Sequence, residues 1–202
     1  MPKLITNREV YDPSALVNWT KRRRNAVRLP ATSSEFLRLL KRKRRGRSAR
    51  THRFFGEVFV ASQIAHREAY YSSAKWLTNT RFAGSRNLPN PDHEAVRQAL
   101  HRHFGQYRIQ KLQSVVGELS RQCRRELRRT LPTAPDLWLV DKRGRHRFIE
   151  VKLPGDSVAP HQLAGMAAIA SVLGSGAMVS VEVVELHDEQ RLFKAFCRAI
   201  AG

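Results

Sequence analysis

The chain has 202 residues, a hydrophobic fraction of 42%, and 37 lysines and arginines against 17 acidic residues, which give a formal net charge of +20. No apolar run is long enough to span a bilayer, which excludes a membrane-spanning protein. The first residues lack the apolar segment of a signal peptide. The two cysteines form no CxxC pair and are interpreted as reduced thiols, so we expect a cytoplasmic protein. A balance this basic predicts a polyanionic partner.

Residues 1–50 are expected to form a basic N-terminal arm. They contain two blocks of like charge, KRRR at 21–24 and KRKRRGR at 41–47. Such blocks repel one another and often stay mobile until they meet an opposite charge. The arm is either a solvated tail or, as we favour, a grip on phosphates through Lys21, Arg22, Arg23, Arg24, Lys41, Arg42, Lys43, Arg44 and Arg45.

Residues 51–202 are expected to form the folded domain. In THRFFGEVFVASQIAHREAYY, apolar residues recur at three- and four-residue steps, which predicts a helix that contains Glu57. The aromatic-rich segment 69–77 has the composition of a strand. The segment AGSRNLPNPD, with its glycine and two prolines, is a loop.

A helical insertion is expected at 84–130. It would hold one helix from Pro91 to Phe104 and a second from about Arg108 to Arg129. The second helix has one apolar stripe, and most of its remaining surface is cationic. That cationic face is either solvated or a rail for a phosphate backbone, with these candidates for DNA contact: Arg121, Arg125 and Arg128.

The last third of the chain predicts an α/β unit in the order strand, strand, helix, strand, helix. The strands are DLWLV, RFIEVKL and AMVSVEVVEL, and the helices are PHQLAGMAAIASVL and DEQRLFKAFCRAIAG. Pro160 lies in the first turn of the first of these helices, where its missing N–H costs nothing.

The turn between the first two strands sets their register. DKRGR fits a three-residue hairpin loop, in which Gly144 takes the left-handed conformation next to a bulge. Counting back from this loop places Asp136 directly opposite Glu150. Because side chains alternate along a strand, Lys152 points the same way as Glu150. A two-residue turn would move Asp136 to the other face.

Two carboxylates this close repel, unless a divalent cation lies between them or one of them is protonated. Mg²⁺ prefers one or two carboxylates together with waters and phosphate oxygens. The arrangement of Asp136, Glu150 and Lys152 therefore predicts a metal site that acts on a phosphodiester. A cluster of ordinary surface salt bridges is the alternative.

These residues also resemble a known motif. Pro135-Asp136 followed by Glu150-Val151-Lys152 resembles the signature of the PD-(D/E)xK nuclease superfamily. The continuation EVKLPGDSVAPHQ is similar to the VRR-NUC family, although Val158 stands where leucine is commoner. The resemblance implies a restriction-endonuclease-like α/β fold, a mixed sheet flanked by helices, with cleavage of DNA that depends on Mg²⁺ or Mn²⁺.

The resemblance also implies roles for single residues. Asp136 and Glu150 would be metal ligands, and the backbone carbonyl of Val151 would be a third. Lys152 would be the catalytic lysine, and Gln162 would support it or a substrate phosphate. These folds usually take a further acid from their first helix, for which Glu57 is our choice and Glu118 the rival.

Two histidines, His146 and His161, flank the proposed site in sequence. They are either ordinary exposed histidines or contacts for phosphate.

Three functions fit these features. The leading one is a structure-selective DNA endonuclease of repair, replication or phage biology, which acts on branched DNA. The same chemistry would also serve an antibacterial toxin, which is a secreted effector with an immunity protein as partner. The third is a DNA-binding module that has lost cleavage. A homodimer is compatible with each of them.

Overall fold

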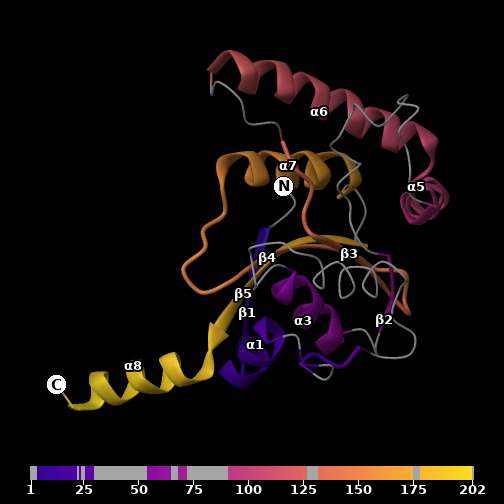
Figure 1. Ribbon diagram of the computed structural model, residues 1–202. Coiled ribbons are helices and arrows are strands. Elements are labelled where there is room, and N and C mark those ends of the chain that lie inside the picture. Colours follow the sequence, from indigo (N-terminus) through magenta and orange to yellow (C-terminus); the bar gives the residue numbers. More distant parts are fainter. Residues whose placement is uncertain are drawn as a thin grey trace.

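The computed structural model describes residues 4–21, 23, 26–29, 54–64, 68–71, 91–126, 132–174 and 178–201. The elements run in the order β1 (Leu4–Tyr11), α1 (Pro13–Thr20), α3 (Phe55–Ile64), β2 (Glu68–Tyr71), α5 (Pro91–Phe104), α6 (Gln106–Glu126), β3 (Leu137–Asp141), β4 (His146–Lys152), α7 (Pro160–Leu173), β5 (Val179–Asp188) and α8 (Glu189–Ala201). Figure 1 shows their arrangement. Among the described residues, no helix is both long enough and apolar enough to cross a membrane.

The sheet has five strands in the order β1-β5-β4-β3-β2. β5 pairs in parallel with both β1 and β4, whereas β3 pairs antiparallel with β4 and β2. The parallel pair β4–β5 needs a crossover, and α7 provides it. A mixed sheet flanked by helices is the expected α/β, restriction-endonuclease-like architecture, and the structure confirms it.

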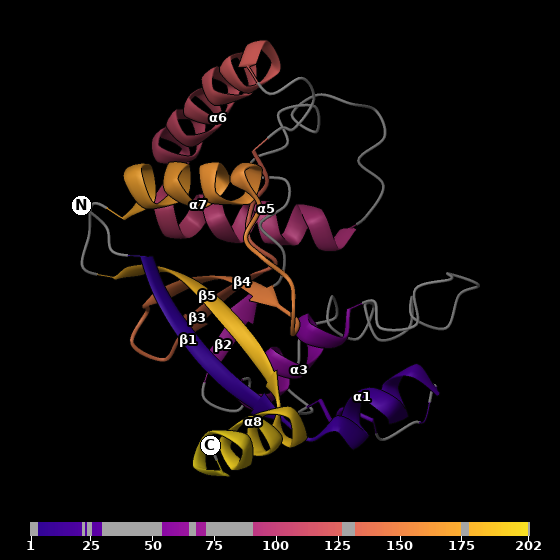
Figure 2. The same ribbon diagram turned by 90° about the vertical axis from the view of Figure 1, so that its left-hand side faces the viewer.

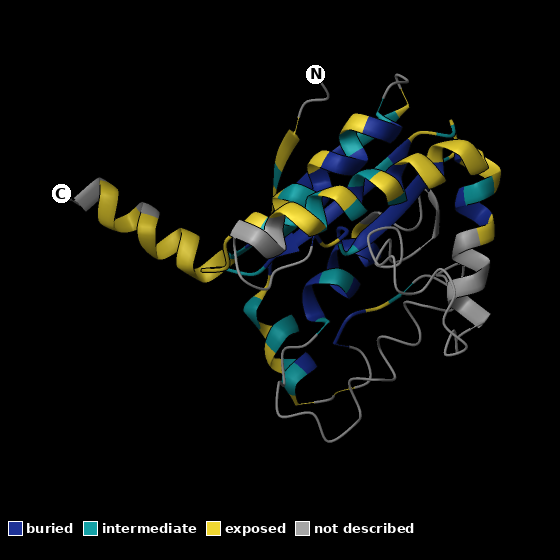
Figure 3. Ribbon diagram, turned by 90° about the horizontal axis from the view of Figure 1, so that it is seen from above, coloured by how far each residue is buried: buried dark blue, intermediate teal, exposed yellow. Residues whose placement is uncertain are grey.

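Each face of the sheet carries its own hydrophobic core, because side chains alternate along a strand. On β4, Phe148 packs under α5, α6 and α7, and Ile149 packs against α1 and α3. Figure 1 shows α7 on one face, with α6 beyond it, and α1 and α3 on the other. The central strands are buried on both sides, as the dark ribbon in Figure 3 shows. Glu150 shares the α7 face with Phe148, so its carboxylate lies between the sheet and a helix.

The expectation of an arm over residues 1–50 is wrong for its first part, because β1 and α1 belong to the fold. β1 pairs with β5 along its whole length. Asp12 caps α1 by accepting a hydrogen bond from the Ser14 N–H at 2.7 Å, and Trp19 is fully buried. Most β1 side chains are exposed, so hydropathy alone does not reveal this strand. The charge block at 41–47 lies outside the described residues.

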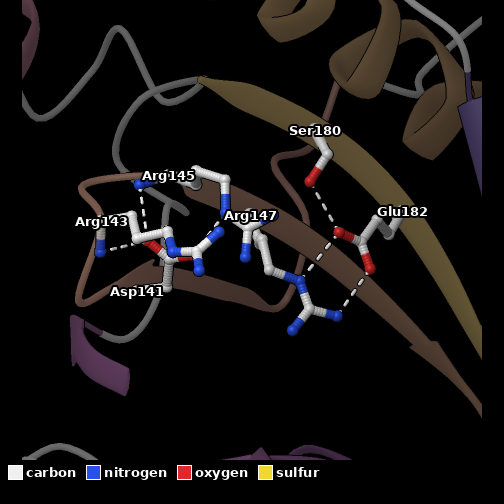
Figure 4. A network of polar contacts seen from close by, with 6 residues as sticks. All are labelled: Asp141, Arg143, Arg145, Arg147, Ser180 and Glu182. Carbon is white, nitrogen blue, oxygen red and sulfur yellow. Dashed lines mark hydrogen bonds and ion pairs between the residues drawn. The ribbon is translucent and has the colours of Figure 1, made fainter. Parts of the chain in front are cut away.

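A buried ion pair ties β1 to the centre of the sheet. The Arg147 guanidinium on β4 donates two hydrogen bonds of 2.8 Å to the Glu182 carboxylate on β5 (Figure 4). Ser180 and Asn7 also donate to this carboxylate, and Asn7 lies on β1. Because four oxygen lone-pair directions are occupied in this way, the buried charge of Glu182 is compensated.

The two helices α5 and α6 come between β2 and β3 in the chain, inside the stretch predicted as an insertion. α5 has the predicted bounds, and Gly105, with φ of 76°, separates it from α6. α6 packs on α7 and forms a layer outside it (Figures 1 and 2). β2 spans Glu68–Tyr71 and overlaps the start of the strand predicted at 69–77, of which residues 72–77 lie outside the described part of the chain. The domain boundaries themselves remain predictions.

Candidate active site

The hairpin between β3 and β4 has the predicted turn. Gly144 has φ of 74°, and its N–H donates to the Asp141 carbonyl oxygen at 3.0 Å. The strand register pairs Leu137 with Ile149, so the next position along both strands sets Asp136 against Glu150. The register predicted from the three-residue loop is therefore confirmed.

Asp141 stabilises this turn from within. Its carboxylate accepts hydrogen bonds from the backbone N–H groups of Arg143 and Arg145, at 2.8 and 2.9 Å, and pairs with the Arg145 guanidinium (Figure 4). These bonds, that of the Arg145 N–H first, hold the pKa of Asp141 below its ordinary value. The charged carboxylate thus closes the loop that sets the register.

At the other end of β4, three polar side chains meet. The Lys152 ammonium lies 3.0 Å from Glu150 Oε1 and donates to Gln162 Oε1 at 2.7 Å. The Gln162 amide nitrogen donates to the same Glu150 oxygen at 2.5 Å. Asp136 Oδ2 accepts a hydrogen bond of 3.0 Å from the Val151 N–H. The structure therefore brings together all four predicted catalytic residues.

Gln162 reaches this cluster because of its place in α7. Pro160 is the first residue of the helix, so Gln162 lies in the first turn and faces the sheet. Its Oε1 also accepts the Ala159 N–H at 2.9 Å, which satisfies a backbone donor at the start of the helix. The amide therefore connects the helix terminus, Lys152 and Glu150, and it holds a single orientation.

The Glu150 carboxyl is in an unfavourable environment for a charge. It is 2% exposed. Burial, and then the neighbouring Asp136 carboxylate, raise its pKa to about 7, and Glu57 adds to this rise. Lys152 acts in the opposite direction without cancelling the rise. An acid held in this state binds a proton or a cation more readily than an exposed one does.

The same interaction separates the two candidates for the further acid. Glu57 lies in the first turn of α3 and acts electrostatically on Glu150. Glu118 lies exposed on α6, where it pairs with Arg121. Gly56 allows α3 to approach the sheet, since a Cβ there would lie 2.9 Å from a Val151 methyl carbon. Glu57 is therefore the candidate that interacts with Glu150, and its role as the further acid stays a prediction.

Comparison with known proteins identifies the domain that carries this cluster. The family model described as VRR-NUC domain matches residues 91–185. The chain contains a VRR-NUC domain. This is a nuclease domain of the PD-(D/E)xK superfamily, which confirms the resemblance seen in residues 135–162. No curated protein and no solved structure matches the chain.

The VRR-NUC match begins at the start of α5 and ends within β5. It includes Asp136, Glu150, Lys152 and Gln162, and it leaves α3 with Glu57 outside. The VRR-NUC domain supports a nuclease function, and a nuclease domain implies DNA as its substrate. Residues before the match complete the sheet, and they include Glu57, which acts electrostatically on Glu150.

The donors present in the VRR-NUC site suit a hard divalent cation. Asp136 and Glu150 offer carboxylate oxygens, which Mg²⁺ and Mn²⁺ prefer. Within the described part of the chain, no three acidic, histidine or cysteine side chains form a ready-made metal cage. A site with few protein ligands is the type in which Mg²⁺ keeps waters and takes phosphate oxygens from the substrate.

Few of the predicted DNA contacts fall on described side chains. Lys21 and Arg23 follow α1 and are exposed. Arg121 is exposed on the outer face of α6, and its guanidinium pairs with Glu118. The remaining candidates lie outside the described side chains: Arg22, Arg24, Lys41, Arg42, Lys43, Arg44, Arg45, Arg125 and Arg128. The C-terminal end of α6 lies on the same side of the molecule as the start of α7 (Figure 2).

The interpretation of His146 as an exposed residue near the site is wrong. It is the first residue of β4, at the end remote from Glu150, and it is 6% exposed. Its Nδ1 accepts a hydrogen bond of 3.1 Å from the Trp138 indole. Burial, and then the nearby His103, lower its pKa to about 4. His146 is therefore a neutral core residue, which the basic sequence around it conceals.

Proposed function

We propose that the chain is a DNA endonuclease dependent on a divalent metal, with Asp136, Glu150, Lys152 and Gln162 as its catalytic residues. The observation that carries this proposal is the contact among Glu150, Lys152 and Gln162, with Asp136 paired across the hairpin. All four lie in the VRR-NUC match. Ordinary surface salt bridges would not be buried, and Glu150 and Lys152 both are.

Asp136, Glu150 and the Val151 carbonyl would hold Mg²⁺ or Mn²⁺, with Glu57 as the further acid. The raised pKa of Glu150 supports this assignment, because a cation relieves the repulsion between converging carboxylates. When bound, the cation supplies Lewis-acid polarisation of the phosphodiester. The carboxylates contribute by holding their negative charges in one place, so that little reorganisation is needed.

Lys152 would act on the substrate directly. Its ammonium has three N–H donors, and the structure shows contacts to Glu150 and Gln162 for two of them. The third is available to a phosphate oxygen or to the attacking water. Held in a buried position, this positive charge stabilises the negative charge that develops on the phosphate. Gln162 keeps the ammonium in place because it accepts from Lys152 and donates to Glu150.

Affinity for DNA would come mainly from phosphate contacts. The net charge of +20 supports a large electrostatic contribution, which depends on salt and carries no sequence information. A protein that binds in this way discriminates by the shape of its substrate. We therefore infer that branched or flapped DNA is the substrate, in repair, replication or phage biology, and that the protein acts in the cytoplasm.

A cleavage panel tests this proposal. Flap, fork, junction, single-stranded and plasmid DNA are incubated with Mg²⁺, Mn²⁺ or EDTA. We expect cleavage that requires a metal and favours branched substrates. Asp136→Asn and Lys152→Met should abolish cleavage and retain DNA affinity, with Glu118→Gln as the matched control that keeps activity. If the wild-type protein binds DNA but cleaves none of the substrates with any metal, the proposal of a nuclease is refuted, and a DNA-binding module is the interpretation that remains.

A further inference from the structure

Gly165, in the second turn of α7, makes the tightest backbone approach among the described glycines. A Cβ on this residue would lie 1.8 Å from the carbonyl oxygen of Thr133 and 2.6 Å from its carbonyl carbon. Atoms at such distances overlap, so no other residue fits unless the backbone moves. Gly165 thus lies against the segment that leads into β3.

The same segment is bonded to the first turn of α7. The Thr133 N–H donates to the His161 carbonyl oxygen at 3.0 Å. Thr133 thus contacts α7 at two successive turns, once by a hydrogen bond at His161 and once by packing at Gly165. Its neighbours Pro132 and Pro135 are buried, and both restrict the backbone. A stiff segment fastened at two points has little freedom to shift along the helix.

This contact joins the two halves of the active site. Asp136 follows Thr133 by three residues, and Gln162 precedes Gly165 by three residues. The contact therefore sets the distance between the strand end that carries Asp136 and the helix turn that holds Gln162 on Lys152. A shift of the segment would move Asp136 relative to Glu150, Lys152 and Gln162 together.

We propose that Gly165 is a positioning residue of the active site: by lacking a side chain, it lets the Thr133 backbone lie against α7 and so places Asp136 opposite the Gln162–Lys152 pair. This proposal rests on the proposed function. The simpler interpretation is that Gly165 serves packing alone. The two differ in what a displaced backbone does to turnover in a protein that is still folded.

The test is Gly165→Ala. To bring the new Cβ to 3.0 Å, the shortest contact that real Cβ atoms show, the Thr133 oxygen must move by 1.2 Å, the difference between 3.0 and 1.8 Å. A misplacement of about 1 Å can cost about 100-fold in rate. We expect turnover to fall about 100-fold, with the KM for DNA unchanged, because the cationic surface is not touched.

Gly117→Ala is the matched control. Gly117 is also a helix glycine, on α6, and a Cβ there would meet nothing within 4 Å. This variant should keep wild-type turnover and should not lower the thermal midpoint. A Gly165→Ala protein that is folded and has wild-type turnover would overturn the proposal, and so would a parallel loss of DNA affinity and turnover.

A second measurement uses the wild-type protein alone, so it depends neither on cleavage nor on whether Gly165→Ala folds. In the metal-free wild-type protein, hydrogen exchange of the Thr133 amide should be slow and should match that of the α7 amides, because they open together. Exchange of Thr133 at the rate of an exposed loop would overturn the proposal. If the wild-type protein cleaves nothing in any metal, the proposed function fails. Slow exchange of Thr133 would then still show the backbone contact.

Discussion

Glu150→Gln tests the electrostatic argument for the metal site without altering the shape of the side chain. In the wild type, burial and the Asp136 carboxylate raise the pKa of Glu150 to about 7 from an ordinary value of 4.5. The native state therefore holds a proton in a pH range where the unfolded chain has lost it. Glutamine cannot ionise, so the variant lacks this linkage between pH and stability.

The sign and size follow from the shift. Between pH 4.5 and about pH 7 the native state binds more protons than the unfolded state, so the stability of the wild type falls as the pH rises. A shift of about 2.5 units at 1.36 kcal/mol per unit corresponds to about 3 kcal/mol. Relative to wild type, Glu150→Gln should thus gain about 3 kcal/mol between pH 4 and pH 8.

Urea unfolding of both proteins across this pH range, without metal, measures the difference directly. Mg²⁺ should then stabilise the wild type at pH 8 more than it stabilises Glu150→Gln, because the variant has lost one of the two carboxylates proposed to bind the cation. A difference in the free energy of unfolding that does not vary with pH would refute the raised pKa of Glu150 in the native state. An equal effect of Mg²⁺ on both proteins would refute the role of Glu150 as a ligand.

Three further predictions follow from other parts of the structure. Gly144→Val should lower the free energy of unfolding by about 1–2 kcal/mol and reduce cleavage, and Gly144→Asn should lower it less, because asparagine tolerates the positive φ. Wild-type stability in the valine variant would contradict the left-handed conformation of residue 144. His146→Gln keeps an acceptor for the Trp138 indole. As the pH falls from 6.5 to 4, the free energy of unfolding of this variant should rise by about 3 kcal/mol relative to that of the wild type, because the native histidine stays neutral while the unfolded one binds a proton. Urea unfolding measures this difference, and parallel pH profiles of the two proteins would show that His146 is not buried. Deletion of residues 1–11 should lower the free energy of unfolding by at least about 3 kcal/mol, because the buried Tyr11 is lost together with the β1–β5 pairing. An unchanged urea midpoint would show that these residues form an arm and not a part of the fold.

The hairpin and its two acids could be predicted because local rules decide them. The loop Lys142–Gly144 specifies its own turn, and the alternation of side chains then assigns Asp136, Glu150 and Lys152 to one face. Gln162 followed from the motif of the resembled family, and its contact with Lys152 agrees with that assignment. None of these steps needs knowledge of a distant segment.

The residues that the sequence placed wrongly depend on contacts between distant segments. β1 has little hydropathy signal, and it forms because β5 offers a free edge to its backbone. His146 lies in a basic stretch, and its burial is decided by α5 packing over Trp138. The electrostatic effect of Glu57 on Glu150 likewise depends on the approach of α3 to β4.

The sequence by itself determined the class of the domain, the register of the hairpin and the group of residues at its centre, because each of these depends on neighbours within a few positions. Only the tertiary structure decided that β1 completes the sheet, that α3 packs against β4, and that Gly165 lies against Thr133. These three contacts join segments between 30 and 180 positions apart. Their geometry depends on how whole helices and strands pack, which no local pattern of residues encodes.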